Sequence, residues 1–296
     1  MKESSDYWKS NLQDESTMTI MNEYLLGLKL ENKAERTIRN YRWFLERYFS
    51  VCTVPLKLLT SEDVRKYLNH FTNGKKERTV DAYLSALSSF LQFCLAEEYI
   101  ENVVIKKRWR PKIPQSLPKY LNEMEFVRVK IAAEISAPRD RALILFLLSS
   151  GCRSSEVSNL SIKDFNLEKR TAEVTGKGKR IRKVHFSEEC AIALKEYLQT
   201  RNNDDGIDPL FLNNSGQRLQ TNSIYYITKK VGKKAGLKQS LHPHICRHTF
   251  ATNMLARGAT LELIADELGH ANLNTTRIYA RILTEDLILA YQNKMG

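Results

Sequence analysis

The sequence predicts a mainly α-helical protein of two domains with one small antiparallel β-sheet. Its 296 residues exceed the usual size of a single compact domain. Apolar residues recur every three or four positions along most of the chain, which is the spacing of one helix face. One stretch, residues 162–186, instead alternates apolar and polar residues in short runs around glycines, as a hairpin sheet does.

Residues 19–105 are predicted to form an all-helical domain of about four or five helices, behind an N-terminal tail of residues 1–18. One helix is expected to start after Ser61, an N-cap type followed by acids in the first turn. Most aromatic residues here fall on apolar faces and are expected in the core rather than on a base-stacking surface. Three helices are marked by apolar residues at helical spacing: Ile20, Tyr24 and Leu28; Ile38, Tyr41, Leu45 and Tyr48; and Val80, Leu84, Leu87, Leu91 and Leu95.

Residues 106–119 are predicted to be a linker between the two domains. They carry six Lys or Arg, no acidic residue and three prolines. The prolines exclude a regular helix or a central strand. The charge makes the segment a candidate strap on DNA, with four candidate contacts: Lys106, Lys107, Arg108 and Arg110.

Residues 120–296 are predicted to form a second helical domain that contains the sheet. Helices are expected near residues 123–133 and 139–148, then a Gly-marked hairpin around residues 175–179, then further helices. The acidic run at 204–208 lies among Pro, Gly and Asn residues and is interpreted as a solvated loop rather than a metal site. A capped amphipathic helix is expected from Thr284, and its apolar face must cover a surface of its own domain or of a neighbouring protomer.

Composition narrows the class of protein. The net charge is +12, and the excess lies after residue 105: residues 1–105 carry 14 basic and 15 acidic residues, whereas residues 120–296 carry 26 and 19. A polyanionic partner fits this distribution as well as a solvated basic surface does. No apolar run approaches 18 residues and no signal core is present, so we expect a cytoplasmic protein without a membrane partner. Five cysteines without CxxC spacing predict reduced thiols, with neither disulfide nor structural zinc.

Six residues in the second domain form a set suited to phosphoryl transfer. Attack on a phosphodiester builds negative charge on its non-bridging oxygens, and an arginine holds two such oxygens at any ordinary pH. A tyrosine with a pKa of about 10 needs a base or a cationic field to attack at neutral pH, and lysine or histidine can protonate the leaving oxygen. The candidates are Arg153, Lys177, His244, Arg247, His270 and Tyr279, with Tyr279 as nucleophile.

The motifs around these residues resemble those of the tyrosine recombinases, also called phage-type integrases, which include the Xer recombinases. The six positions occur in the family's chain order, and the resemblance covers residues 19–296. The matching motifs are Gly151-Cys152-Arg153-Ser154-Ser155-Glu156, Gly176-Lys177-Gly178, His244 to His248 as His-x-x-Arg-His, Leu268-Gly269-His270, and Thr-x-x-Tyr ending at Tyr279.

The resemblance implies a two-domain clamp around DNA, with a helical core-binding domain and an α+β catalytic domain. It implies a site-specific recombinase that forms a 3′-phosphotyrosine and acts as a homotetramer on double-stranded DNA with inverted half-sites, or with a related recombinase as hetero-partner. Glu156 becomes a structural carboxylate, and Lys177 becomes the leaving-group acid. The family uses no metal, cofactor or small-molecule substrate. Docking of the C-terminal helix on a neighbouring protomer is also implied.

Several alternatives stay open. His242 and His248 flank the motif and compete with His244, and Tyr291 competes with Tyr279. Cys152 and Cys246 stand where the family more often has leucine, and we expect them in the core. A DNA-relaxing enzyme of the type IB kind and a non-catalytic DNA-binding relative are the competing functions. The sequence does not separate chromosome or plasmid resolution from transposon resolution or integration.

Overall fold

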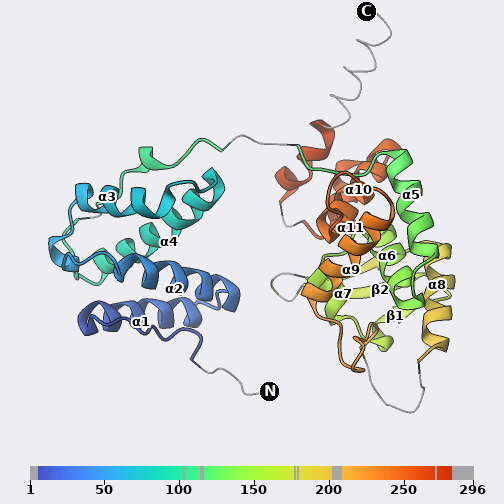
Figure 1. Ribbon diagram of the computed structural model, residues 1–296, viewed down its shortest axis with the longest axis horizontal. Coiled ribbons are helices and arrows are strands. Elements are labelled where there is room, and N and C mark those ends of the chain that lie inside the picture. Colours follow the sequence, from blue (N-terminus) through green and yellow to red (C-terminus); the bar gives the residue numbers. More distant parts are fainter. Residues whose placement is uncertain are drawn as a thin grey trace, which may run out of the picture. The chain divides into compact units, whose positions relative to one another are not determined.

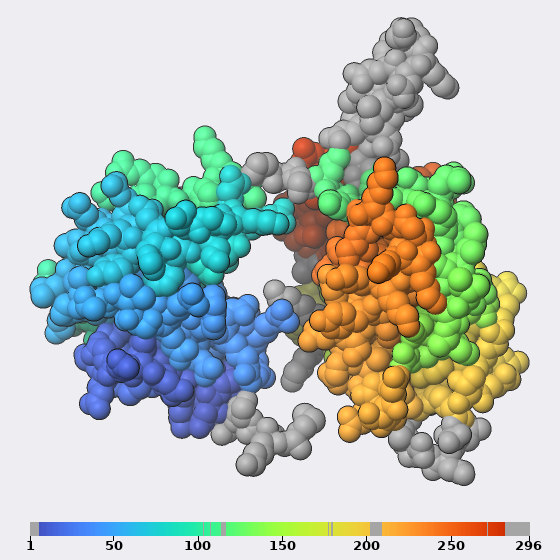
Figure 2. Space-filling view, viewed as in Figure 1, coloured from blue at the N-terminus to red at the C-terminus, as the bar shows by residue number. Residues whose placement is uncertain are grey.

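The computed structural model describes residues 6–102, 104–113, 117–176, 178, 180–201, 209–270 and 272–281. The chain divides into two compact units, unit 1 from Met1 to Gln115 and unit 2 from Ser116 to Gly296. The described part of unit 1 consists of helices and loops, and unit 2 combines helices with one three-stranded sheet (Figure 1). Each unit forms a continuous packed body (Figure 2). The predicted fold class is confirmed.

The described part of unit 1 contains four α-helices, and side-chain caps start the first and the third. Asp14 caps the first helix by accepting a hydrogen bond from the Thr17 amide, so this helix begins before residue 19. Thr60, one residue before the expected Ser61, caps the third helix in a reciprocal box with Asp63. The four helices are α1 (Glu15–Leu30), α2 (Glu35–Phe49), α3 (Ser61–Thr72) and α4 (Glu77–Ala96).

The core of unit 1 is rich in aromatic rings, as the sequence predicts. Tyr24 packs edge-on against Phe90 with 5.4 Å between the ring centroids, and Phe44 stacks on Tyr83 at 4.4 Å. Both Tyr48 and Phe90 are fully buried. These pairs join α1, α2 and α4 into one body through large buried surfaces. Tyr7, Trp8 and Leu12, from the segment predicted as a tail, pack against the same core.

The first part of the predicted linker belongs structurally to unit 1. Trp109 packs against the core of this unit, as Val104 and Ile105 do just before the linker, and a short 3₁₀ helix spans Lys107–Trp109. Arg110 bonds to the Asp81 carboxylate at 2.7 Å and to the Ser85 hydroxyl at 2.9 Å. Lys106 and Arg108 are exposed, and the side chain of Lys107 lies outside the described part of the chain.

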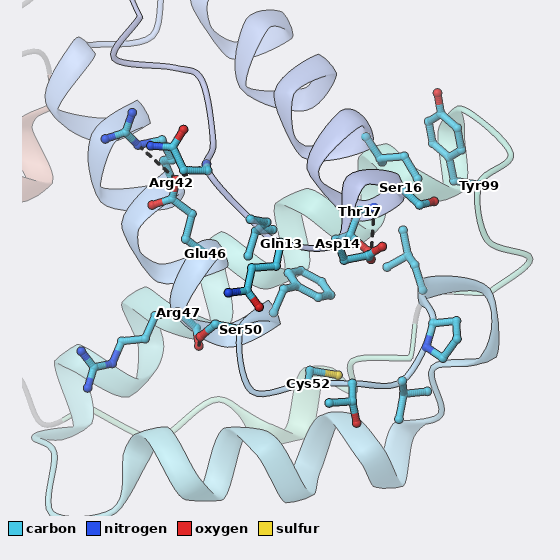
Figure 3. A pocket seen from close by; sticks show the side chains of 18 of the residues that line it. Gln13, Asp14, Ser16, Thr17, Arg42, Glu46, Arg47, Ser50, Cys52 and Tyr99 are labelled. Atoms are coloured by element: carbon cyan, nitrogen blue, oxygen red, sulfur yellow. Dashed lines mark hydrogen bonds and ion pairs between the residues drawn. The ribbon is translucent and has the colours of Figure 1, made fainter.

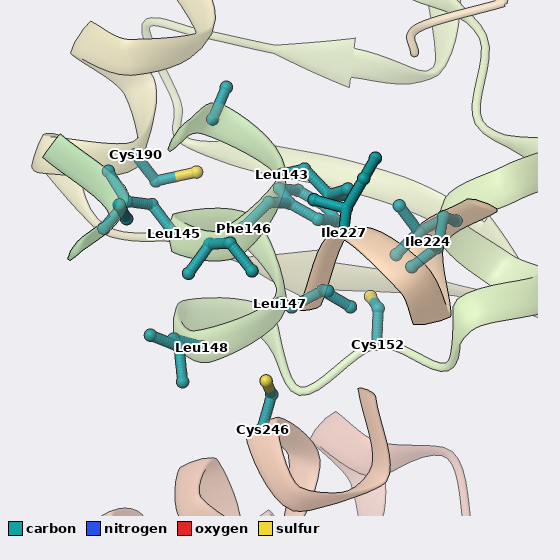
Figure 4. Packing of buried hydrophobic residues seen from close by; sticks show 14 of the residues in the cluster. Leu143, Leu145, Phe146, Leu147, Leu148, Cys152, Cys190, Ile224, Ile227 and Cys246 are labelled. Atoms are coloured by element: carbon teal, nitrogen blue, oxygen red, sulfur yellow. The ribbon is translucent and has the colours of Figure 1, made fainter. Parts of the chain in front are cut away.

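Unit 2 is built around one buried helix. This helix, α6 (Pro138–Ser150), is apolar on all sides over residues 142–148 and packs against the elements named below as α5, α8, α10 and β3. Leu143, Phe146 and Leu147 fill the space between it and the neighbouring helices (Figure 4). The elements are α5 (Glu123–Glu134), α6 (Pro138–Ser150), α7 (Ser154–Asn159), β1 (Phe165–Asn166), β2 (Thr171–Thr175), β3 (Ile181–His185), α8 (Glu188–Gln199), α9 (Thr221–Lys234), α10 (Pro243–Ala256) and α11 (Leu261–Leu268).

The sheet lies where the alternating pattern predicts it. Its strands run antiparallel in the order β1-β2-β3, and Ala172 on β2 pairs with Val184 on β3. The side chains of Ala172, Val174 and Val184 are buried, whereas Glu173 and Lys183 between them are exposed. This alternation places one sheet face on the core. Lys177, at the predicted hairpin tip, lies outside the described residues.

Cys152 and Cys246 lie in the core, as the sequence predicts. All five are free and buried, and Cys152, Cys190 and Cys246 are part of the unit 2 core (Figure 4). Burial raises the pKa of Cys152 and Cys246 to about 12, so both remain thiols. Among the described residues no helix is both long and apolar enough to span a membrane.

Candidate active site

Five of the six candidate catalytic residues lie in unit 2 on segments that meet at one place. Arg153 lies between α6 and α7, His244 and Arg247 lie on α10, and His270 directly follows α11. The main-chain carbonyl of Leu268 is the meeting point, because it accepts hydrogen bonds from both arginines. The sixth candidate, Lys177, lies outside the described residues.

Gly151 lets the segment that carries Arg153 turn sharply into the site. It ends α6 in the left-handed conformation, with φ of 61°, where glycine carries no steric penalty. A Cβ atom here would lie 2.4 Å from Phe250 Cδ1 and 2.9 Å from Leu268 Cδ2. Any larger residue would therefore push Arg153 away from α10 and α11.

Arg247 is a fixed, buried cation. Its side chain donates to the carbonyl of Gly151 at 2.7 Å and to that of Leu268 at 2.6 Å. The residue is only 4% exposed, and burial lowers the pKa of Arg247 to about 10. The guanidinium still carries its charge at neutral pH, and neutral carbonyls hold it in place. Charge held in this way is available to a bound phosphate.

Arg153 is oriented by Glu156. The Glu156 carboxylate accepts from the Arg153 backbone amide and from its guanidinium, both at 2.8 Å. The Glu156 side chain is 1% exposed, whereas that of Arg153 is 30% exposed. The arginine thus reaches solvent from a buried anchor, which agrees with the structural role expected for Glu156.

Tyr279 lies beside the two arginines and contacts a neighbouring histidine. Its phenol oxygen is 2.9 Å from Nδ1 of His248, and the rings are 5.7 Å apart. Burial raises the pKa of Tyr279, and the charges of Arg247 and Arg153 partly offset this shift. The residue is 2% exposed and packs with Ile264 and Leu268.

His270 is oriented by the threonine of the Thr-x-x-Tyr motif. Its Nδ1 lies 2.9 Å from the hydroxyl of Thr276, which is fully buried. This contact fixes the ring plane and leaves Nε2 for a second partner. The threonine therefore couples the histidine to the segment that carries Tyr279, three residues further along the chain.

The histidines around the arginines are neutral at physiological pH. Burial, together with the charges of Arg247 and Arg153, lowers the pKa of His270 to about 4. Burial, His244 and Arg247 likewise lower the pKa of His248 to about 4. The pKa of His244 is also lowered, first by partial burial and then by the two arginines. Neutral imidazoles can accept or donate a proton without adding charge to the site.

The three histidines that were candidates for the proton-transfer group lie in different places. His242 is the N-cap residue of α10, and its ring stacks on Tyr225 with centroids 6.3 Å apart. His244 is exposed at the start of the same helix. His248 faces Tyr279. No local pattern predicts this last contact, because 31 residues separate the two partners. The assignment of His244 as the proton-transfer group stays a prediction.

The described residues contain no group of three or more His, Cys, Asp and Glu side chains arranged for a metal ion. The acidic run at 204–208 lies outside them. A cavity of about 990 Å³ lies in unit 1 between α1, α2 and the loop that contains Cys52 (Figure 3). None of the candidate catalytic residues lines it. One of its two arginines, Arg42, already donates to the carbonyl of Lys9 and pairs with Glu46.

A buried arginine, a partly exposed arginine, neutral histidines and a tyrosine lie together in unit 2. Side chains of these kinds suit enzymes that transfer a phosphoryl group to tyrosine. A model of the phage integrase family matches residues 119–286, and one of the N-terminal SAM-like domain of phage integrases matches residues 20–101. Tyrosine recombinase XerA of Pyrococcus horikoshii is 36% identical over 273 residues, 90% of each chain. Tyrosine recombinase XerC of Thermodesulfovibrio yellowstonii is 32% identical over 288 residues, 93% of this chain and 96% of the relative.

Solved structures show the same relationship. The recombinase XerH, bound to a palindromic difH substrate in a post-cleavage complex, matches with a TM-score of 0.76 and 26% identity. The match covers 97% of this chain and 91% of that one. This chain belongs to the phage integrase family of tyrosine-type site-specific DNA recombinases. The resemblance drawn from the sequence motifs is confirmed.

Proposed function

We propose that this protein exchanges DNA strands between two copies of a specific site through a 3′-phosphotyrosine at Tyr279. The convergence of Arg153 and Arg247 on one carbonyl, with Tyr279 within reach of their charges, carries this proposal. The XerH structure is a post-cleavage complex with a palindromic difH substrate, which supports double-stranded DNA as the partner proposed here. The basic excess after residue 105 agrees with a polyanionic partner.

In the cleavage step, the Tyr279 oxygen attacks the scissile phosphorus. A bond from that oxygen to phosphorus forms, the bond from phosphorus to the 5′ oxygen breaks, and the 5′ oxygen gains a proton while the phenol loses one. Arg153 and Arg247 stabilise the charge that develops on the non-bridging oxygens. Attack by a 5′ hydroxyl of the partner duplex reverses the step and rejoins the strands. One phosphoester bond replaces another each time, so no external energy source is needed.

The histidines have distinct places in this scheme. His248 contacts the phenol and is neutral, so its tautomer protonated on Nε2 is a second candidate, beside His244, to accept the phenol proton. His270, held by Thr276, presents Nε2 to the phosphate. Lys177 is proposed as the acid that protonates the 5′ oxygen. Four protomers on two duplexes with inverted half-sites complete the proposed assembly.

The test compares one site with two. DNA that becomes covalently attached to the protein in cells is sequenced to obtain the site, which is cloned into plasmids as one copy, two copies or a scrambled sequence. We expect covalent complex on one copy and deletion or inversion only between two copies. Relaxation of every plasmid without site preference would instead indicate a type IB-like enzyme. Binding without any adduct would indicate a non-catalytic relative.

A further inference from the structure

Arg182 of β3 is a buried cation that the catalytic set does not include. Its Nη1 and Nη2 atoms bond to the two oxygens of Glu156 at 2.8 and 3.0 Å, a bidentate pair. Its Nε donates to the main-chain carbonyl of Glu267 at 2.9 Å. The side chain is 14% exposed. One guanidinium therefore joins the strand after the Lys177 hairpin to two other segments of unit 2.

The first partner of Arg182 is also the anchor of Arg153. Glu156 holds both guanidinium groups through the same carboxylate, and Oε1 lies 2.8 Å from each. Burial opposes ionisation of Glu156, but the hydrogen bonds from Arg182 and Arg153 outweigh it and lower the pKa of Glu156. Without Arg182, a buried carboxylate would have Arg153 as its remaining cation and would draw it inward, away from solvent.

The second contact fixes the turn that presents His270. Glu267 is followed by Leu268, whose carbonyl accepts from both catalytic arginines, and then by Gly269. Gly269 ends α11 with φ of 63°, and a Cβ atom there would lie 3.0 Å from Cδ, Nε and Nη1 of Arg182. The arginine thus packs directly on this turn. His270 is the next residue, and Arg182 is among the charges that lower its pKa.

We propose that Arg182 is a positioning residue of the active site, which locks the carboxylate that orients Arg153 to the turn that presents His270. It touches no reacting atom in the proposed mechanism. A lysine cannot replace it, because an ammonium lacks the planar fork that grips two carboxylate oxygens while Nε reaches a third acceptor. The inference rests on the proposed function for its catalytic consequence, but the geometry that it predicts can be measured without DNA.

The experiment uses the full chain and three variants: Arg182→Met, Arg182→Lys and, as a control, Lys183→Met. Lys183 is the next residue on β3, is exposed and loses the same charge. The first measurement is the NMR titration of the His270 ring in DNA-free protein. The second is the single-turnover rate of covalent complex formation on the DNA site that was identified by sequencing covalently attached DNA. Half-site affinity and melting temperature are measured for each variant as well.

We expect Arg182→Met to raise the pKa of His270 toward 6.5, because a nearby positive charge is removed. Its cleavage rate should fall about 10²-fold at near wild-type half-site affinity, since small displacements of catalytic groups cost this much. Arg182→Lys keeps the charge and should leave the titration near that of wild type, yet lose most of the cleavage rate. Lys183→Met should match wild type in both measurements.

A purely structural ion pair predicts a different pattern. Arg182→Met would then melt at a lower temperature while its folded fraction cleaves at the wild-type rate and its His270 titration stays unmoved, and this result would overturn the proposal. If Arg182→Met does not fold, Arg182→Met combined with Glu156→Gln removes the unpaired buried charge, and the same changes are expected. Absence of adduct in wild type would count against the proposed function, while the titration would still decide the placement of Arg182 beside His270.

Discussion

The two units bury different kinds of side chain. In the described residues of unit 1, the buried polar residues are Ser10 and Thr17 and no charged side chain is buried. The rest of the core is apolar, with cysteines and tyrosines among its side chains. In unit 2, Asp140, Glu156 and Arg247 are buried charges. Burying a charge is costly unless it is paired and hydrogen-bonded. Apolar packing therefore stabilises unit 1. Unit 2 also contains buried charges, which need ion pairs and hydrogen bonds to offset the cost of their burial.

The largest expected effect separates catalysis from folding. Arg247→Ala removes a donor aimed at the phosphate, so cleavage should fall on the order of 10²–10³-fold. Arg153→Ala should cause a similar loss. Single-turnover adduct formation, compared with half-site affinity from gel shifts, measures this separation. A cleavage rate within a few-fold of wild type in either variant would remove that arginine from the proposed mechanism.

A paired substitution tests whether the two cores depend on different forces. Glu156→Ala leaves Arg182 buried without its carboxylate and should destabilise unit 2 by about 3–5 kcal/mol. Phe90→Ala empties part of the aromatic core of unit 1 and should cost about 3–5 kcal/mol there. All three tryptophans, Trp8, Trp43 and Trp109, lie in unit 1, so their fluorescence reports that unit.

Urea unfolding followed by fluorescence should therefore shift with Phe90→Ala and stay in place with Glu156→Ala. Circular dichroism, which reports both units, should shift with each. Equal shifts of the fluorescence transition in the two variants would mean that the units unfold as one body. This result would contradict the claim that the two cores can be destabilised separately.

Acid should weaken unit 2 before unit 1. His248 and His270 have folded pKa values of about 4, against 6.5 for a free imidazole. Between these values the unfolded chain binds more protons, so stability is complete above pH 6.5 and falls as the pH drops toward 4. Each histidine contributes on the order of 1–3 kcal/mol. Melting at pH 7.5 and pH 5 should show a larger drop by circular dichroism than by tryptophan fluorescence, and an unchanged unit 2 transition would contradict these pKa values.

The smallest expected effect concerns the basic linker. Lys106 and Arg108 are exposed, whereas Arg110 is held by Asp81 and Ser85. Neutralising Lys106 and Arg108 together should weaken binding to every DNA sequence alike and reduce the salt slope by about two. Arg110→Ala should change the slope less. Loss of site discrimination with an unchanged slope would rule out the strap.

Much of this arrangement could be read from the sequence because its signals are local. Helical spacing predicted the helices of both units, alternation predicted β2 and β3, and the motifs predicted the residues that meet at Leu268. Contacts between distant positions could not be read. Arg182 meets Glu156 across 26 residues and the Glu267 carbonyl across 85, and nothing distinguishes it from the other basic residues near the hairpin. The ion pair between Arg110 and Asp81 could not be predicted either, because 29 residues separate the two partners.

The nucleophile is the central claim, and mapping the covalent bond tests it most directly. Wild-type protein and Tyr279→Phe are each incubated with the DNA site that was identified by sequencing covalently attached DNA. The protein and DNA are then digested, and mass spectrometry identifies the peptide that carries the nucleotide. We expect the adduct on Tyr279 in wild type, and no adduct in Tyr279→Phe although half-site binding is retained, because only the attacking oxygen is removed. An adduct in Tyr279→Phe, or a nucleotide found on Tyr291 in wild type, would contradict the account.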